Sequence, residues 1–165
     1  MSRAFVNEDQ AADQADQPVE RRISEQPNYV TASGLRQLQT RVAELNALRS
    51  ELQAQGEQGD KQRLADTERD LRYFSAREQS AQVVPAATSH SKVQIGSRVR
   101  FVDAQDQEQV VRLVGEDEAD AGHGLINWGS PLGRALLGAG PGDEVVWRRP
   151  VGEQVIEVVE ILGEG

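Results

Sequence analysis

The sequence has 165 residues, with 27 acidic against 18 basic side chains and a formal net charge of −9. This acidic excess argues against nonspecific binding to nucleic acid or to an anionic membrane, and it suits a basic protein partner. The chain has no cysteine, which excludes disulfides and thiolate metal sites. No apolar run reaches membrane-spanning length and the N-terminal residues lack a hydrophobic signal core, so we expect a soluble cytoplasmic protein.

The N-terminal segment, residues 1–27, is polar and rich in alanine and glutamine. Its apolar content is too small to offset the entropy lost on ordering, so we predict a mobile acidic tail. Two prolines, Pro18 and Pro27, bracket the end of this tail.

Two apolar stripes predict an antiparallel helical hairpin over residues 28–84. The first follows Thr31, a suitable N-cap, and runs to about Gln55 with apolar residues at steps of three or four. Residues 56–60 contain two glycines and no apolar residue, which predicts a turn, after which a second stripe lets the two helices bury each other. The stripes consist of Leu35, Leu38, Val42, Leu45, Leu48 and Leu52, then Leu64, Thr67, Leu71, Phe74 and Ala81; the basic residues Arg36, Arg41, Arg63 and Arg77 are expected on the solvated face.

A second domain is predicted over residues 93–165, after a small-residue linker at 85–92. Ser130 followed by Pro131 predicts a helix start, with a hydroxyl N-cap and then a proline where no amide donor is needed. Strands separated by short turns, with one short helix, predict a small α+β domain. The expected strands cover 93–102, 108–114, 125–128, 144–149 and 154–162, and the valine pairs at 110–111, 145–146 and 158–159 leave open which member faces the core.

Three blocks in this second domain resemble the bacterial Gre (GreA/GreB) transcription elongation factors. They are the run V-G-E-D-E-A-D at 114–120, the run S-P-x-x-R-A-L from Ser130, and the pair Gly142-Asp143 before a strand. The resemblance implies an N-terminal antiparallel α-helical coiled-coil hairpin followed by a small FKBP-like antiparallel β-sheet domain with one short helix.

The likeness extends into the hairpin. Tyr29-Val30-Thr31, with Gly34 three residues on, resembles the beginning of the family's coiled coil, and residues 81–84 resemble its end. Between these two points the chain is shorter than the usual hairpin of the family.

The function implied by this resemblance is regulation of RNA polymerase. The C-terminal domain would bind the polymerase and the coiled coil would enter its secondary channel, modulating elongation or initiation. An acidic surface with an apolar edge at Pro131 and Leu132 suits a basic helical partner. The resemblance also implies a monomer without membrane contact that meets nucleic acid only indirectly, inside the polymerase complex. The implied partner-binding residues are Asp120, Ser130, Pro131 and Arg134; the alternative for each is a structural role, such as an ion pair of Arg134 with a neighbouring carboxylate.

The hairpin turn determines which version of this function we expect. In cleavage-competent members two tip carboxylates help to hold a second Mg²⁺ at the polymerase active site. Here Asp60 matches the start of that motif, but the second acid is missing from its place and Glu57 lies before it instead. Because Lys61 and Arg63 would also repel a cation, we predict turn residues, no catalytic group and no intrinsic cofactor.

The sequence leaves two alternative functions open. In the first, the protein is a true cleavage factor in which Asp60 and Glu57 hold Mg²⁺ shared with the polymerase. In the second, it is a prolyl isomerase, which only the implied FKBP-like fold suggests. Too few aromatic residues are present to line a proline pocket as well as a core; they include Phe101, Trp128 and Trp147, of which the tryptophans are predicted to lie in strands and the core. His90 and His123 have no companion ligands and are expected in loops.

Overall fold

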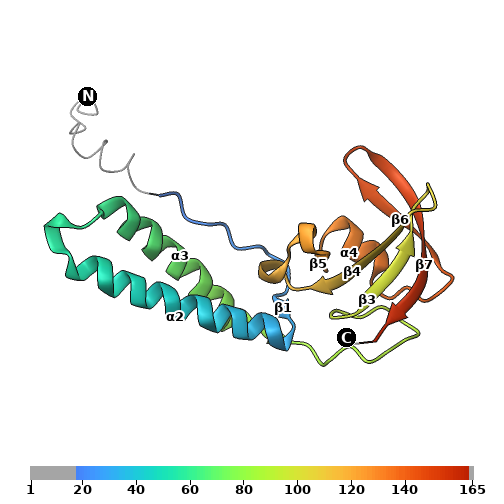
Figure 1. The fold of residues 1–165 in the computed structure, drawn as a ribbon, viewed down its shortest axis with the longest axis horizontal. Helices are drawn as coiled ribbons and strands as arrows, with labels where there is room; N and C mark the ends of the chain where they lie inside the picture. The colour runs from blue at the N-terminus through green and yellow to red at the C-terminus, as the bar shows by residue number, and fades with distance from the viewer. Residues whose placement is uncertain (1–17, 164–165) are drawn as a thin grey trace, which may run out of the picture. The chain divides into compact units, whose positions relative to one another are not determined.

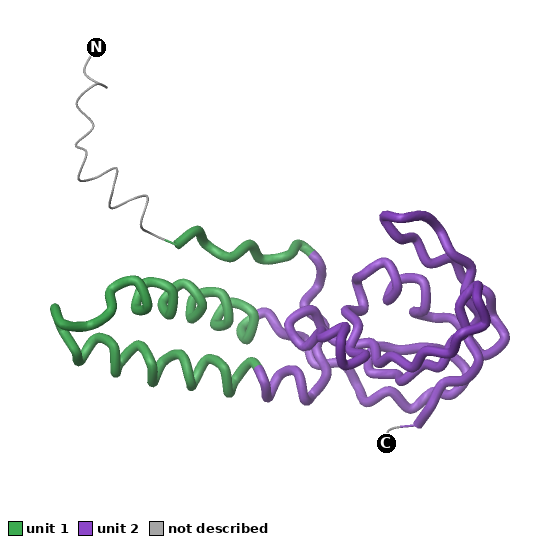
Figure 2. Tube along the Cα trace, turned by 45° about the horizontal axis from the view of Figure 1, so that its top comes forward, with its two compact units in different colours: residues 1–25, 38–79 green, residues 26–37, 80–165 purple. Residues whose placement is uncertain are grey.

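The computed structural model describes residues 18–163. Residues 1–17 of the predicted mobile tail therefore lie outside the described part of the chain. The chain divides into two compact units (Figure 2). We call residues 18–25 and 38–79 the hairpin unit, and residues 26–37 and 80–163 the sheet unit.

Two long helices run back along each other (Figure 1), and most of their residues belong to the hairpin unit. They are α2, Ala32–Ala54, and α3, Lys61–Ser80, joined by the 3₁₀ turn η2, Gly56–Gln58. Gly56 has a φ of 59°, a conformation that glycine adopts without strain, so the predicted turn forms where the glycines are. The predicted helical hairpin is confirmed.

The interior of the hairpin differs in part from the predicted stripes. In α2 the buried leucines recur every seven residues, from Leu38 to Leu52. In α3, Tyr73 is buried instead of the predicted Phe74, which is only half-buried. The expectation of a solvated Arg77 is wrong, since only 1% of that side chain is exposed. Burial of a guanidinium depends on tertiary contacts that helical periodicity does not encode. The buried residues of the unit are Leu38, Leu45, Leu52, Thr67, Leu71, Tyr73 and Arg77.

Part of the predicted tail lies against α3. The guanidinium of Arg21 lies 4.0 Å from the ring centre of Tyr73 and 4.9 Å from that of Phe74. It also forms an ion pair with Asp70 at 3.4 Å. Glu20 pairs with Arg72, two residues after Asp70. Residues 18–25 are therefore attached to the hairpin by charged and cation–π contacts.

The sheet unit begins with a small two-stranded sheet. Strand β1, Tyr29–Val30, pairs in parallel with β2, Gln82–Val83, so the segments before α2 and after α3 are joined by backbone hydrogen bonds. The amide of Asn28 adds a hydrogen bond to the hydroxyl of Ser80 at 3.1 Å.

The main sheet has five strands in the order β5-β4-β3-β7-β6 (Figure 1). All neighbours are antiparallel except β4 and β5, which are parallel, so the predicted antiparallel sheet has one parallel edge. The first strand begins at Arg98 and not at 93, because Gly96, with a φ of 99°, breaks the extended run. The strands are β3, Arg98–Val102; β4, Glu108–Val114; β5, Leu125–Asn127; β6, Glu144–Arg149; and β7, Gly152–Leu162.

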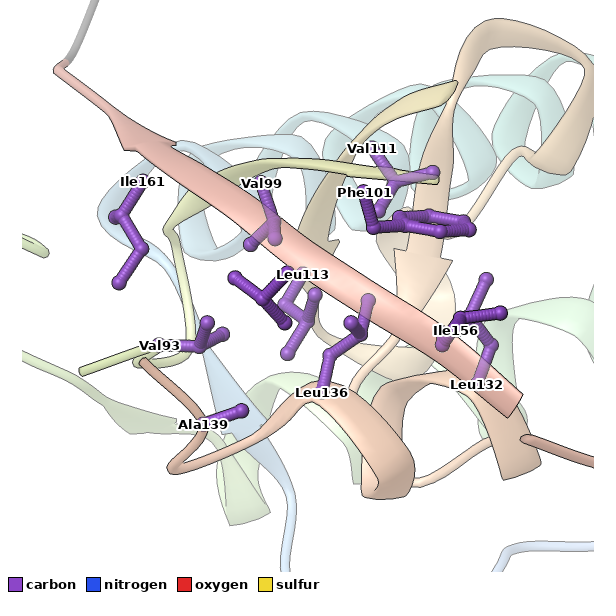
Figure 3. Packing of buried hydrophobic residues seen from close by; sticks show 11 residues of the cluster. Val93, Val99, Phe101, Val111, Leu113, Leu132, Leu136, Ala139, Ile156 and Ile161 are labelled. Atoms are coloured by element: carbon purple, nitrogen blue, oxygen red, sulfur yellow. The ribbon is translucent and has the colours of Figure 1, made fainter. Parts of the chain in front are cut away.

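One short helix, α4, Pro131–Leu136, covers one face of this sheet. Figure 3 shows Leu132 and Leu136 of α4 pointing toward Leu113 and Ile156 on the strands. The valine pairs are resolved by burial: the core-facing members are Val111, Val145 and Val158, and the outward-facing members are Val110, Val146 and Val159. Trp147 packs against the core as predicted, whereas Trp128 follows β5 and contacts Tyr29 in a tilted arrangement, with ring centres 5.3 Å apart.

No helix within residues 18–163 is both long and apolar enough to cross a membrane.

Candidate functional site

The start of α4 is fixed by a side-chain cap. The Ser130 hydroxyl accepts a hydrogen bond from the backbone N–H of Gly133 at 3.1 Å, and Pro131 occupies the first turn. Gly133 itself lies against strand-end carbonyls: a Cβ there would be 2.3 Å from the Asn127 oxygen and 2.5 Å from the Trp128 oxygen. The lack of a side chain at Gly133 therefore allows α4 to lie directly on the end of β5.

An apolar groove of about 430 Å³ lies beside this helix start. Two of the predicted partner-binding residues, Ser130 and Pro131, form one side of it. The β6–β7 hairpin forms the other side, with Val151 at its turn 84% exposed. The remaining lining residues are Ile126, Leu132, Trp147, Arg148, Arg149 and Pro150.

Trp147 forms part of the groove and is held by aromatic contacts. Its ring meets that of Phe101 edge-to-face, with centres 6.4 Å apart, and the Arg149 guanidinium lies 5.3 Å from its centre. The Nε of Arg149 is buried and has no hydrogen-bond acceptor among the described residues. Leu132, which the sequence placed at an exposed apolar edge, is instead buried in the core. The apolar edge comes from Pro131 and Val151.

The other two predicted residues, Asp120 and Arg134, do not line the groove. The Asp120 carboxylate contacts the His123 imidazole at 2.6 Å, and its backbone bridges to Leu125 at the beginning of β5. Ser130 lies beyond the other end of β5, where its N–H donates to the Asn127 carbonyl. Arg134 is exposed and forms no ion pair within residues 18–163. The structure thus brings Ser130 and Pro131 together and places Asp120 at the opposite end of β5.

The acidic run after β4 has one carboxylate with a clear structural role. Glu118 accepts a hydrogen bond from the Thr31 hydroxyl, whose oxygen lies 2.9 and 2.8 Å from the two carboxylate oxygens. Gly115 lies against the Tyr29 carbonyl, which would be 2.7 Å from an added Cβ. The segment around Thr31 and the acidic run at Glu118, which are 87 residues apart in the sequence, therefore contact each other within the sheet unit.

At the hairpin turn, both candidate carboxylates are exposed. Glu57 lies within η2, and Asp60 precedes α3, where its Oδ1 accepts a hydrogen bond from the Arg63 N–H at 2.9 Å. Asp60 is therefore the N-cap of α3. Among residues 18–163, no group of three or more His, Asp or Glu side chains is arranged to hold a metal ion.

A helical hairpin and a five-stranded sheet with one capped helix define the class of this chain: an α+β protein with a helical hairpin unit and a β-rich unit. Residues 88–162 match the family model described as transcription elongation factor, GreA/GreB, C-term. Transcription elongation factor GreB of Neisseria meningitidis is 32% identical over 155 residues, which cover 84% of this chain and 95% of that protein. The chain therefore belongs to the GreA/GreB family of transcription elongation factors, as the sequence motifs indicated.

Two further proteins are similar to this chain. Transcription elongation factor GreA of a Nitratiruptor species is 38% identical over 103 residues, which cover 61% of this chain and 63% of that protein. The crystal structure of GreA factor homolog 1 (Gfh1) of Thermus thermophilus is 24% identical and covers 84% of this chain and all of that one, with a TM-score of 0.41.

Proposed function

We propose that this Gre-family factor binds RNA polymerase through its C-terminal domain and inserts its hairpin into the secondary channel, where it modulates elongation or initiation. It would act in the cytoplasm as a monomer and meet nucleic acid only within the polymerase complex. The observation that carries the proposal is the apolar groove between Ser130-Pro131 and the β6–β7 turn, because one side of it is a motif shared with the family.

The groove has the chemistry of a protein-docking site. Exposed Val151 and half-buried Trp147 supply apolar area to its lining, and Arg148 adds a positive charge. Interfaces of this kind combine an apolar, aromatic centre with a charged rim. The buried Nε of Arg149 is a donor that an acceptor on the docked surface would satisfy.

The hairpin turn favours a regulator without strong stimulation of RNA cleavage. One oxygen of Asp60 already caps α3, and Lys61 and Arg63 flank it with positive charge. We propose that the chain carries no catalytic group or cofactor of its own. The alternative, a cleavage factor sharing Mg²⁺ with the polymerase, is favoured by one observation: Glu57 and Asp60 are exposed at the same turn. Cleavage of RNA in stalled, backtracked elongation complexes, lost in the Asp60→Asn variant, would support that alternative.

A matched pair of substitutions tests docking. Val151→Glu places a charge in the groove and should weaken binding to RNA polymerase core enzyme by at least about tenfold, measured by biolayer interferometry. Val159→Glu makes the same change at an outward-facing residue of the sheet unit outside the groove, and it should leave binding unchanged. Equal binding of both variants and the parent would refute docking through the groove. A clear rate in a proline-peptide isomerisation assay would support the isomerase alternative.

A further inference from the structure

A second cavity, of about 710 Å³, lies within the sheet unit and has no part in the proposed docking. Its walls come from the first turns of α2, from residues 84–87 after β2, from residues 95–96, and from single side chains of β4, η3 (Glu116–Glu118) and β5. It is larger than the apolar groove and also differs from it in charge.

Two arginines line this cavity, Arg36 on α2 and Arg112 on β4. Neither forms an ion pair or a side-chain hydrogen bond with any residue in 18–163. Arg112 also lies directly opposite Arg98 in the β3–β4 register. Like charges opposite each other on neighbouring strands repel, and no carboxylate of the described residues forms an ion pair with either arginine. In a chain of net charge −9, these guanidinium groups are positioned to bind an anion.

The cavity also has apolar lining. Val84, Pro85, Ile95 and Leu125 contribute it, so a ligand that uses both kinds of lining carries an anionic group and a flat or apolar body. A cavity of this volume is of the size that holds small organic ligands. Guanidinium groups bind phosphate well, because their parallel N–H donors match its oxygens.

One carboxylate, that of Glu118, also lines the cavity. Its oxygens accept the hydrogen bond from the Thr31 hydroxyl. Glu118 would repel a phosphate, so the anionic group belongs at the arginine side. The two charges should therefore affect anion affinity in opposite directions. Removing the negative charge of Glu118 should raise the affinity, and removing the positive charge of Arg112 should lower it.

We propose that this cavity binds a nucleotide, with its phosphates at Arg36 and Arg112 and its base against the apolar side chains of Pro85 and Ile95. The binding requires neither RNA polymerase nor the groove, so it goes beyond the proposed docking and is tested separately from it.

Isothermal titration calorimetry on the full chain at low salt tests the proposal with ATP, inorganic pyrophosphate and adenosine. We expect ATP to bind more tightly than pyrophosphate, and adenosine to show no measurable binding. Arg112→Gln should weaken ATP binding by about tenfold, and Glu118→Gln, which keeps an acceptor for Thr31, should strengthen it. Arg63→Gln removes the same charge outside the cavity and should have no effect. Added salt should weaken binding.

An amide NMR titration of the unaltered protein provides a test that does not depend on the folding of a variant. We expect ATP to shift the signals of Ser33, Arg36, Gly96 and Arg112 and to leave those of residues 56–60 in place. The proposal is overturned by the absence of ATP binding at millimolar concentration, or by shifts confined to residues outside the cavity. Changes of equal sign in the Arg112→Gln and Glu118→Gln variants, or pyrophosphate binding as tight as that of ATP, would also overturn it.

Discussion

The Thr31 hydroxyl connects the beginning of α2 to the acidic run after β4. Its oxygen accepts a hydrogen bond from the Gly34 N–H at 3.0 Å and donates to the Glu118 carboxylate at 2.8 Å. One side chain therefore caps a helix and satisfies a half-buried carboxylate at once. This explains in physical terms why a threonine before α2 and a glutamate after β4 belong to the same structural feature, although each lies in a separate motif of the sequence.

Replacement of Thr31 by valine tests this connection. The shape of the side chain is kept, but the cap of α2 is lost and Glu118 loses its donor, so unfolding should become easier by about 2 kcal/mol. Urea unfolding followed by tryptophan fluorescence measures the change, since Trp128 and Trp147 are both in the sheet unit. Thr31→Ser keeps the hydroxyl and should retain most of the stability. Equal loss in both variants would contradict the role of the hydrogen bonds.

A second prediction concerns Gly133 in α4. Alanine normally stabilises a helix relative to glycine, but a Cβ at this position would overlap the Asn127 and Trp128 carbonyl oxygens. Gly133→Ala should therefore reduce stability, by about 3 kcal/mol, because the helix must move away from the end of β5. Ala135→Gly in the same helix is the control, with an expected loss of about 1 kcal/mol from helix propensity. Thermal unfolding of the two variants gives the comparison.

The capped helices were the most predictable parts of this structure. A hydroxyl cap can be predicted because its hydrogen bond joins residues only three apart in the sequence. Both Thr31 and Ser130 cap the helices that the sequence predicted. The groove beside Ser130 was not predictable, because Val151 reaches it only through the pairing of β6 with β7. The parallel pairing of β4 with β5 could not be predicted from the sequence either, because strand order depends on contacts between distant segments.

Burial within the hairpin shows the same limit. The stripe predicted Phe74 as the buried ring, because it follows Leu71 by three residues, but periodicity does not distinguish it reliably from the adjacent Tyr73. The structure buries Tyr73 and covers both rings with the guanidinium of Arg21, which comes from a segment predicted to be mobile. The charged residues of a polar segment thus make contacts that composition alone does not reveal.

The third prediction tests this attachment. Arg21→Ala removes the cation–π contacts to Tyr73 and Phe74 and the ion pair with Asp70, and should destabilise the hairpin by about 1 kcal/mol. Hydrogen exchange in the part of α3 around these residues should become faster. Arg22→Ala is the matched control, because the neighbouring arginine makes no ion pair or cation–π contact within residues 18–163. Similar exchange rates in the two variants would contradict the attachment.

The pairing of Glu20 with Arg72 predicts a pH dependence. The hydrogen bond from the Arg72 guanidinium lowers the pKa of Glu20 below its ordinary value of 4.5, although the group is exposed. A carboxyl group whose pKa is lowered in the folded state contributes stability when the pH is above its pKa in the unfolded state. This contribution is lost as the pH falls through its pKa in the folded state. Glu20→Gln should thus destabilise the attached segment at neutral pH, and its difference from the parent should vanish well below pH 4.5. Hydrogen exchange of α3 against pH measures this.

The last prediction separates the structural role of Asp60 from a metal-binding role. As the N-cap of α3, Asp60 needs an acceptor oxygen but no charge, so Asp60→Asn should preserve helix stability while Asp60→Ala costs about 1 kcal/mol. A Mg²⁺ ligand needs the carboxylate, since an amide oxygen binds this hard cation less strongly. We therefore expect Asp60→Asn to match the parent both in chemical unfolding and in transcription assays with RNA polymerase. If this variant keeps its stability but loses an effect on backtracked complexes, the carboxylate has a catalytic role at the polymerase and the proposed function must be revised to a cleavage factor.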